Sequence, residues 1–123
     1  GAPVSSMGSL EGAGNYLQSL GYELEKEPVR QEDITLPKEF DSVYEEYNNL
    51  QKECGFDLSP YKGKNLTLYT YRLTNYPGEP EAMADVLLKG EKVVGGSVYS
   101  AALDGFMHGL RPVSDAQDSS SNP

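Results

Sequence analysis

The sequence predicts a two-layer α+β domain, with two main helices packed on one face of an antiparallel sheet of about four or five strands. Apolar residues recur at helical spacing in two segments, residues 9–20 and 37–54. Three runs of β-favouring residues, separated by short turns, follow in the second half of the chain. The expected element order is α-β-β-α-β-β-β. A chain of 123 residues suits one domain, which we place at residues 9–111.

The first helix is predicted over residues 9–20. Ser9 is a suitable N-cap, and Gly21 stands where a helix C-terminus favours glycine. Residues 1–8 are rich in Gly, Ser and Pro, so we interpret them as a linker or a cloning remnant. Because the chain opens without an initiator Met, we expect that a signal peptide or an anchor was removed upstream. The apolar stripe of the helix consists of Leu10, Ala13, Leu17 and Leu20.

Two strands are predicted before the second helix. Residues 22–24 form a short one, and residues 29–36 form another whose many charges suit a sheet edge. The second helix is predicted within residues 37–54, starting at Asp41 or at the Pro37 turn and ending at Gly55. Its apolar positions are Phe40, Val43, Tyr44, Tyr47, Leu50 and Cys54.

The second half of the chain predicts a three-stranded meander over residues 65–74, 82–88 and 93–101. The first of these strands is apolar on both sides, which indicates a central strand covered in part on both faces. Gly95 and Gly96 interrupt the last strand, and we expect a β-bulge there rather than a ligand contact. Residues 103–110 are expected to form a single helical turn that places Phe106, Met107 and Leu110 against the core. Residues 112–123 are polar and are expected to be a disordered tail.

The composition argues against two classes of partner. The chain has 19 acidic and 10 basic residues, for a net charge of −9. A protein that binds nucleic acids or anionic membrane surfaces needs clustered Lys and Arg, so we expect this domain to bind neither. The expected partner is an unknown protein or a small ligand. Membrane contact is expected only through an N-terminal segment absent from this chain, and the oligomeric state is left open.

Few residues of the sequence suit catalysis. Cys54 is the only cysteine, and we expect it to be a structural thiol. His108, the only histidine, follows Asp104 by four residues. Such a pair could orient a general base, or the histidine could cap the end of a short helix. Neither a phosphate-binding glycine motif nor an EF-hand loop occurs. We therefore expect no catalytic residue, no cofactor and no metal.

Several motifs of the chain resemble one family. They are Leu20-Gly-Tyr-Glu-Leu24, Phe40-Asp-Ser-Val-Tyr-Glu-Glu-Tyr47, Gly55-Phe-Asp-Leu58, Thr74-Asn-Tyr-Pro77, Val94-Gly-Gly-Ser-Val98 and Leu103-Asp-Gly-Phe-Met-His-Gly-Leu110. Over residues 15–110 the chain resembles the domain of unknown function 4830, a family of Clostridia-type Gram-positive bacteria. The resemblance implies an extracytoplasmic protein, exported or membrane-tethered, and it implies no reaction.

Two functional hypotheses follow. The favoured one is a non-enzymatic binding or accessory module tethered at the bacterial cell surface, which works through a sheet edge or a tyrosine-rich surface. The alternative is a small hydrolase or metal-assisted enzyme that uses Asp104 and His108. The candidate interaction site comprises Gly95, Gly96, Tyr99, Asp104 and His108.

Overall fold

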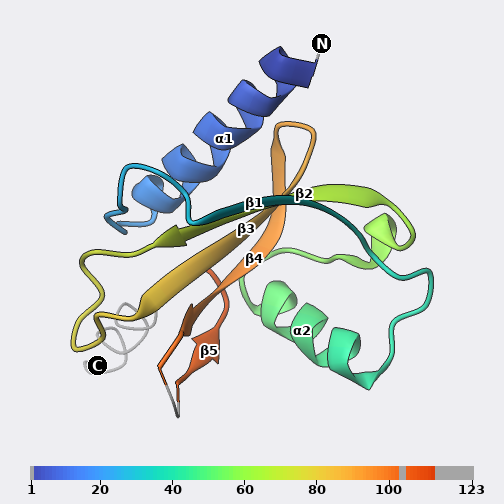
Figure 1. The fold of residues 1–123 in the computed structure, drawn as a ribbon. Coiled ribbons are helices and arrows are strands. Elements are labelled where there is room, and N and C mark those ends of the chain that lie inside the picture. The colour runs from blue at the N-terminus through green and yellow to red at the C-terminus, as the bar shows by residue number, and fades with distance from the viewer. Residues whose placement is uncertain (1, 103–104, 113–123) are drawn as a thin grey trace.

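A computed structural model describes residues 2–102 and 105–112 of the chain. Helices and strands alternate only in the first half, and strands follow one another in the second (Figure 1). The elements are α1 (Ala2–Ser19), β1 (Arg30–Thr35), α2 (Ser42–Glu53), the 3₁₀ turn η1 (Ser59–Tyr61), β2 (Asn65–Arg72), β3 (Ala82–Lys89), β4 (Lys92–Ser100) and β5 (Met107–His108).

The strands form one sheet in chain order, β1-β2-β3-β4-β5, and every neighbouring pair is antiparallel. This confirms the α+β class, the antiparallel sheet and the expected number of strands. The predicted meander corresponds to β2, β3 and β4. The edge position predicted for residues 29–36 is also confirmed, because β1 pairs only with β2 and exposes its first four residues.

The layers differ from the prediction, because the two helices lie on opposite faces of the sheet (Figure 1). Ala13 and Leu17 of α1 pack against one face, together with Tyr69 and Val86. Tyr44 and Tyr47 of α2 pack on the other face, in a separate cluster. Neighbouring residues of a strand point to opposite faces. Apolar residues on both sides of β2 and β3 therefore need a helix on each side.

α2 begins at an N-cap and ends against the bulge of β4. Asp41 accepts a hydrogen bond from the Tyr44 N–H at 2.9 Å, as expected for an N-cap carboxylate. At the other end, Gln51 is 1% exposed and its amide pairs with the Gly96 backbone. Gln51 Nε2 donates to the Gly96 carbonyl, and the Gly96 N–H donates to Gln51 Oε1, both at 2.8 Å.

The bulge predicted at Gly95-Gly96 is confirmed. Leu87 pairs with Gly95 and Leu88 with Val93, which leaves Val94 as the extra residue. The glycines are needed for space, since a Cβ on Gly96 would lie 2.2 Å from the Asp85 carbonyl oxygen. The bulge thus lets α2 approach the backbone of β4 through one glutamine side chain.

Three local predictions differ from the structure. Residues 22–24 form no strand and contribute only the isolated bridge between Leu24 and Leu73. The segment before Leu110 contains the two-residue strand β5 instead of a helical turn, because its backbone pairs with the end of β4. Leu110 is buried as expected, but Met107 is 53% exposed. Helix α1 begins at Ala2, so it includes most of the segment interpreted as a linker.

The predicted tail lies outside the described residues, apart from Pro112. Asp104 also lies outside them. The described part therefore covers both helices, all five strands and one member of the Asp104–His108 pair.

Candidate binding site

A polar row crosses the sheet on the face toward α2. The strand register sets four residues side by side across β1 to β4, and the alternation of side chains places them on one face. The row comprises Arg30, Thr70, Asp85 and Ser97. Leu68 and Leu87 lie two residues further along their strands on the same face, so the row borders an apolar surface.

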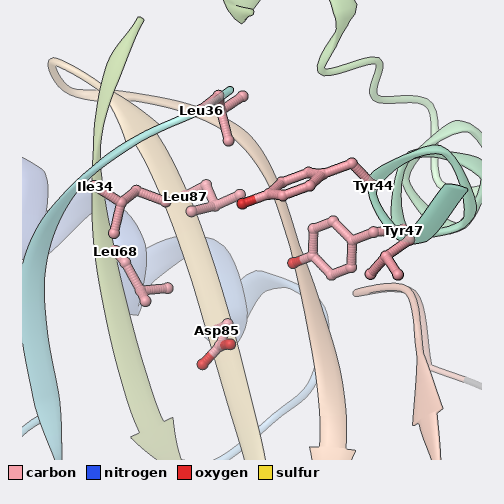
Figure 2. Close-up of a pocket in the computed structure, with 8 residues that line it drawn as sticks. Ile34, Leu36, Tyr44, Tyr47, Leu68, Asp85 and Leu87 are labelled. Carbon is pink, nitrogen blue, oxygen red and sulfur yellow. The ribbon is translucent and has the colours of Figure 1, made fainter. Parts of the chain in front are cut away.

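A pocket of about 310 Å³ lies between this surface and α2 (Figure 2). Figure 2 shows Tyr44 and Tyr47 projecting from α2 toward the strands, with Asp85 on the strand below them. The volume is at the lower end of the range typical of small-molecule sites, about 300–1,000 Å³. The lining residues are Ile34, Leu36, Val43, Tyr44, Tyr47, Leu68, Asp85 and Leu87.

Asp85 is the only carboxylate among the described residues that line this pocket. Its Oδ1 accepts a hydrogen bond from the Thr70 hydroxyl at 2.6 Å and a longer one from the Tyr99 hydroxyl at 3.4 Å. Burial raises the pKa of the Asp85 carboxyl, against the opposing effects of the Thr70 hydrogen bond and the Arg30 charge. The charged form of Asp85 is therefore incompletely compensated in the folded chain.

The two tyrosines of α2 form the helix wall of the pocket. Tyr44 and Tyr47 are three residues apart, so they share one face of the helix. The Tyr47 hydroxyl donates to Ser97 Oγ at 3.3 Å, which ties the ring to β4. Burial raises the pKa of Tyr47 to about 12, so this hydroxyl keeps its proton at neutral pH.

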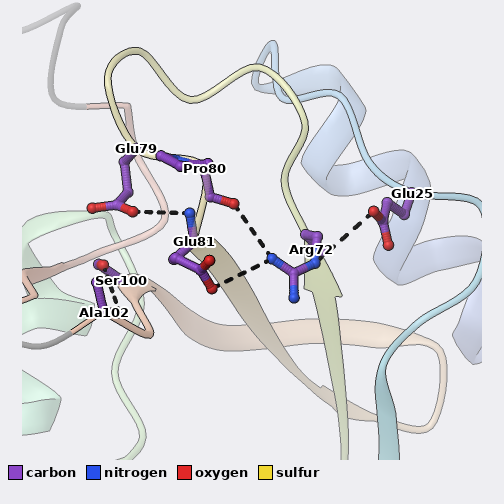
Figure 3. A network of polar contacts seen from close by, with 7 residues as sticks. All are labelled: Glu25, Arg72, Glu79, Pro80, Glu81, Ser100 and Ala102. Atoms are coloured by element: carbon purple, nitrogen blue, oxygen red, sulfur yellow. Dashed lines mark hydrogen bonds and ion pairs between the residues drawn. The ribbon is translucent and has the colours of Figure 1, made fainter.

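A second hollow lies beside the loop between β2 and β3 and is lined in part by Arg72. Figure 3 shows the polar contacts of the Arg72 guanidinium. The guanidinium contacts Glu25 at 3.9 Å and Glu81 at 3.7 Å, and it donates to the Pro80 carbonyl at 3.3 Å. Its charge is thus already shared between two carboxylates of the chain. The pocket under α2 is the better candidate site, because its carboxylate has no such counter-ion in direct contact among the described residues.

Asp104 lies outside the described residues, and the other four predicted interaction residues are distributed over different parts of the sheet. Tyr99 lies beside the pocket and donates to Asp85. Gly95 and Gly96 do not line the pocket and lie against Gln51 of α2. His108 pairs with Val98, so it faces the side of α1. The structure thus does not bring the four described residues together into one site.

His108 uses both ring nitrogens in hydrogen bonds. Nδ1 lies 2.6 Å from the Gly109 carbonyl, which only accepts, so Nδ1 carries the proton. In the neutral ring Nε2 then accepts from the Tyr76 hydroxyl at 2.9 Å. The ring also stacks on Phe106, with centroids 5.7 Å apart. Burial lowers the pKa of His108, which favours this neutral form.

The environment of Cys54 is that of a packed structural thiol. Its sulfur accepts a hydrogen bond from the Arg111 N–H at 3.4 Å, three residues after the end of β5. Among the described residues, no group of three or more His, Cys, Asp and Glu side chains is placed to hold a metal ion.

Sequence reasoning missed the pocket and its central residue. The strand pattern predicts only that Asp85 is part of a strand, although it is the one charged residue in the run from Ala82 to Leu88. A lone carboxylate in a strand that is apolar on both sides must be accommodated at a cost, and functional sites often bear such costs. That isolation was the available signal.

The chain matches the family model described as "Domain of unknown function (DUF4830)" over residues 16–98, and it belongs to this family. No curated protein and no solved structure matches the chain. All eight residues that line the pocket lie inside the matched range, whereas His108 lies outside it. In the part of the chain that the structure describes, no helix has both the length and the apolar character needed to cross a membrane.

Proposed function

We propose that the domain is a non-enzymatic binding module that takes a small ligand into the pocket between α2 and the sheet. The observation that carries the proposal is the pocket itself, a cavity of about 310 Å³ with mostly apolar walls and one half-buried carboxylate. Apolar walls with a few fixed polar groups are the usual composition of small-molecule sites. The occupied ring nitrogens of His108 favour a structural role for this residue over a catalytic one.

The binding proposal is tested by titrating the ¹⁵N-labelled chain with small aromatic and aliphatic alcohols, amines and carboxylic acids. We expect the largest amide shifts at Leu68, Asp85 and Leu87, which line the pocket. Substituting Ile34→Trp should fill the pocket and weaken binding about tenfold or more, because the added ring occupies the ligand volume. The matched control is Val29→Trp, at a residue that is 49% exposed and outside the pocket.

Shifts that cluster elsewhere, or equal affinities for the two tryptophan variants, would contradict this proposal. Chemical-shift dispersion of each variant shows whether it is folded.

We further propose that the module works outside the cytoplasmic membrane, exported or membrane-tethered at the surface of a Gram-positive bacterium. The support is the family resemblance and the acidic composition, which suits a soluble domain with no affinity for anionic headgroups. Protease treatment of intact cells that produce the full-length protein tests the location. Degradation of the domain is expected, and complete protection in intact but not lysed cells would contradict it.

A further inference from the structure

The carboxylate in the pocket retains an oxygen that makes no hydrogen bond with the described residues. Both hydrogen bonds of Asp85, from Thr70 and from Tyr99, go to Oδ1. Figure 2 shows the carboxyl group below the two tyrosine rings, on the strand that forms the floor of the pocket. A half-buried carboxylate with acceptor capacity left is a site for a hydrogen-bond donor, and a charged donor makes the strongest such bond.

The charges around Asp85 do not neutralise it. Arg30 and Glu32, on β1, face the same side of the sheet and form an ion pair with Nη1 and Oε1 3.5 Å apart. Both side chains are about half exposed, at 49% and 45%, so solvent screens them. The three groups together carry one positive and two negative charges, a net charge of −1. A cation that enters the pocket therefore meets an uncompensated negative charge.

The walls of the pocket suit a cation that bears an apolar body. Tyr44 and Tyr47 present aromatic rings, and a positive charge close to such a ring is attracted to its electron-rich face. The hydrocarbon part of a ligand would contact Ile34, Leu68 and Leu87 on the strands. An anionic ligand would instead meet Asp85 at close range, and such repulsion between buried like charges is costly.

We propose that the natural ligand of this pocket is a small primary amine with an apolar body, whose ammonium group binds Asp85. This proposal rests on the proposed function, since it names the chemical class of ligand for the same pocket. The ammonium donates to the free Oδ2 of Asp85, and the apolar body lies between the tyrosine wall and the leucines of β2 and β3. The carboxylate gives selectivity, and the apolar walls give the remaining affinity.

A matched set of probes tests the ligand class at pH 7. 2-Phenylethylamine, 2-phenylethanol and 3-phenylpropanoate share an aromatic body and differ in charge. We expect the amine to bind about tenfold more tightly than the alcohol, the value of one charge-assisted contact of about 1.4 kcal/mol. The anion is expected to bind more weakly than both. Amide shifts of the ¹⁵N-labelled chain give the affinities and locate the site.

Two variants assign the selectivity to Asp85. Asp85→Asn keeps the size of the side chain and an oxygen for the Thr70 hydroxyl, and it should bind the amine and the alcohol equally. Asp33→Asn is the control, because Asp33 is an exposed residue of β1 that points away from the pocket, unlike its neighbours in the chain. This variant should keep the tenfold preference for the amine. Backbone shifts far from the substitution confirm that both variants are folded.

The outcomes of these titrations distinguish failure of the amine proposal from failure of the binding module. Equal binding of the amine and the alcohol by the unaltered chain overturns the amine proposal and leaves the binding module standing. Binding of none of the three probes overturns both. A preference for the amine that persists in Asp85→Asn, or that disappears in Asp33→Asn, places the cation on the general acidic surface and also overturns the amine proposal.

Discussion

The side chain of Gln51 hydrogen-bonds to the backbone of β4 at the bulge. Its amide gives the Gly96 backbone one donor and one acceptor, both at 2.8 Å, which is what a neighbouring strand would supply. A buried backbone group without such a partner costs about 1–3 kcal/mol. Gln51 therefore stabilises both the bulge and the position of α2.

Substituting Gln51→Ala should lower the free energy of unfolding by about 3 kcal/mol. The variant leaves the Gly96 N–H and C=O groups unpaired and opens a cavity where the side chain was. Urea denaturation followed by circular dichroism measures the change. The control is Asn49→Ala on the exposed side of the same helix, where a change below about 0.5 kcal/mol is expected. Comparable losses in both variants would show that the amide pairing contributes little.

Asp85 should destabilise the fold at neutral pH. Burial raises the pKa of its carboxyl in the folded chain, so protonated Asp85 is favoured by folding, and the stability from this preference is fully present below the ordinary pKa of 3.8. That contribution is lost as the pH rises through the raised folded-state pKa. We therefore expect Asp85→Asn to unfold at a higher urea concentration than the unaltered chain at pH 7, with the difference shrinking toward pH 4.

Urea midpoints measured across this pH range check the prediction for Asp85. Asp33→Asn is again the control, because its carboxylate is exposed. An unaltered chain that is more stable than Asp85→Asn at pH 7 would mean that the Thr70 and Tyr99 hydrogen bonds outweigh the cost of burial.

At the scale of elements, the first turn of α2 couples the helix cap to the pocket. The Asp41 carboxylate accepts the N–H of Tyr44, and the ring of Tyr44 forms part of the pocket wall. Loss of the cap should therefore loosen the same turn that positions this ring.

Substituting Asp41→Ala should cost about 1 kcal/mol of stability, as expected for the loss of an N-cap acceptor. Asp41→Asn keeps an acceptor oxygen and should change stability by only a few tenths of a kcal/mol. Urea denaturation compares the two. The same pair of variants, titrated with 2-phenylethylamine, should show weaker binding for Asp41→Ala alone. Equal stability of the two variants would contradict the capping role.

The elements that could be predicted from sequence are those with a strong local pattern. The stripe of α1, the capped helix α2 and the meander each repeat a local period over many residues. β5 has only two residues and therefore no repeating pattern. It forms because its backbone pairs with the end of β4. Such an element depends on tertiary context, which local patterns do not contain.

The placement of the helices and of the pocket depended on contacts distant in sequence. An amphipathic helix shows that it has a buried side, but not which face of a sheet it covers. The apolar residues on both sides of β2 did indicate cover on both faces, and the two helices supply it. The pocket joins β1, α2, β2 and β3, and of its residues only Asp85 stood out locally.

At the scale of the whole molecule, the sheet separates two apolar clusters that span different lengths of the chain. The cluster under α1 spans almost the whole described chain, from Leu10 to Leu110. The cluster under α2 is built only from residues 34–94. Because the family match over residues 16–98 contains all of the second cluster, the pocket lies entirely within the matched part of the chain.

The pairing of strands in chain order also shapes how the molecule folds. Lys89 and Lys92 pair across a two-residue turn, so joining β3 to β4 closes a very short loop and loses little chain entropy. β2 adds to this hairpin through a connection of moderate length, whereas α1 must find strands more than 45 residues away in sequence. Topologies dominated by local pairings reach the native state faster than those that depend on distant ones. The hairpin of β3 and β4 carries both Asp85 and the bulge. Of the pairings in the sheet, it loses the least chain entropy on forming, so it is the nucleus on which we expect the other strands to assemble.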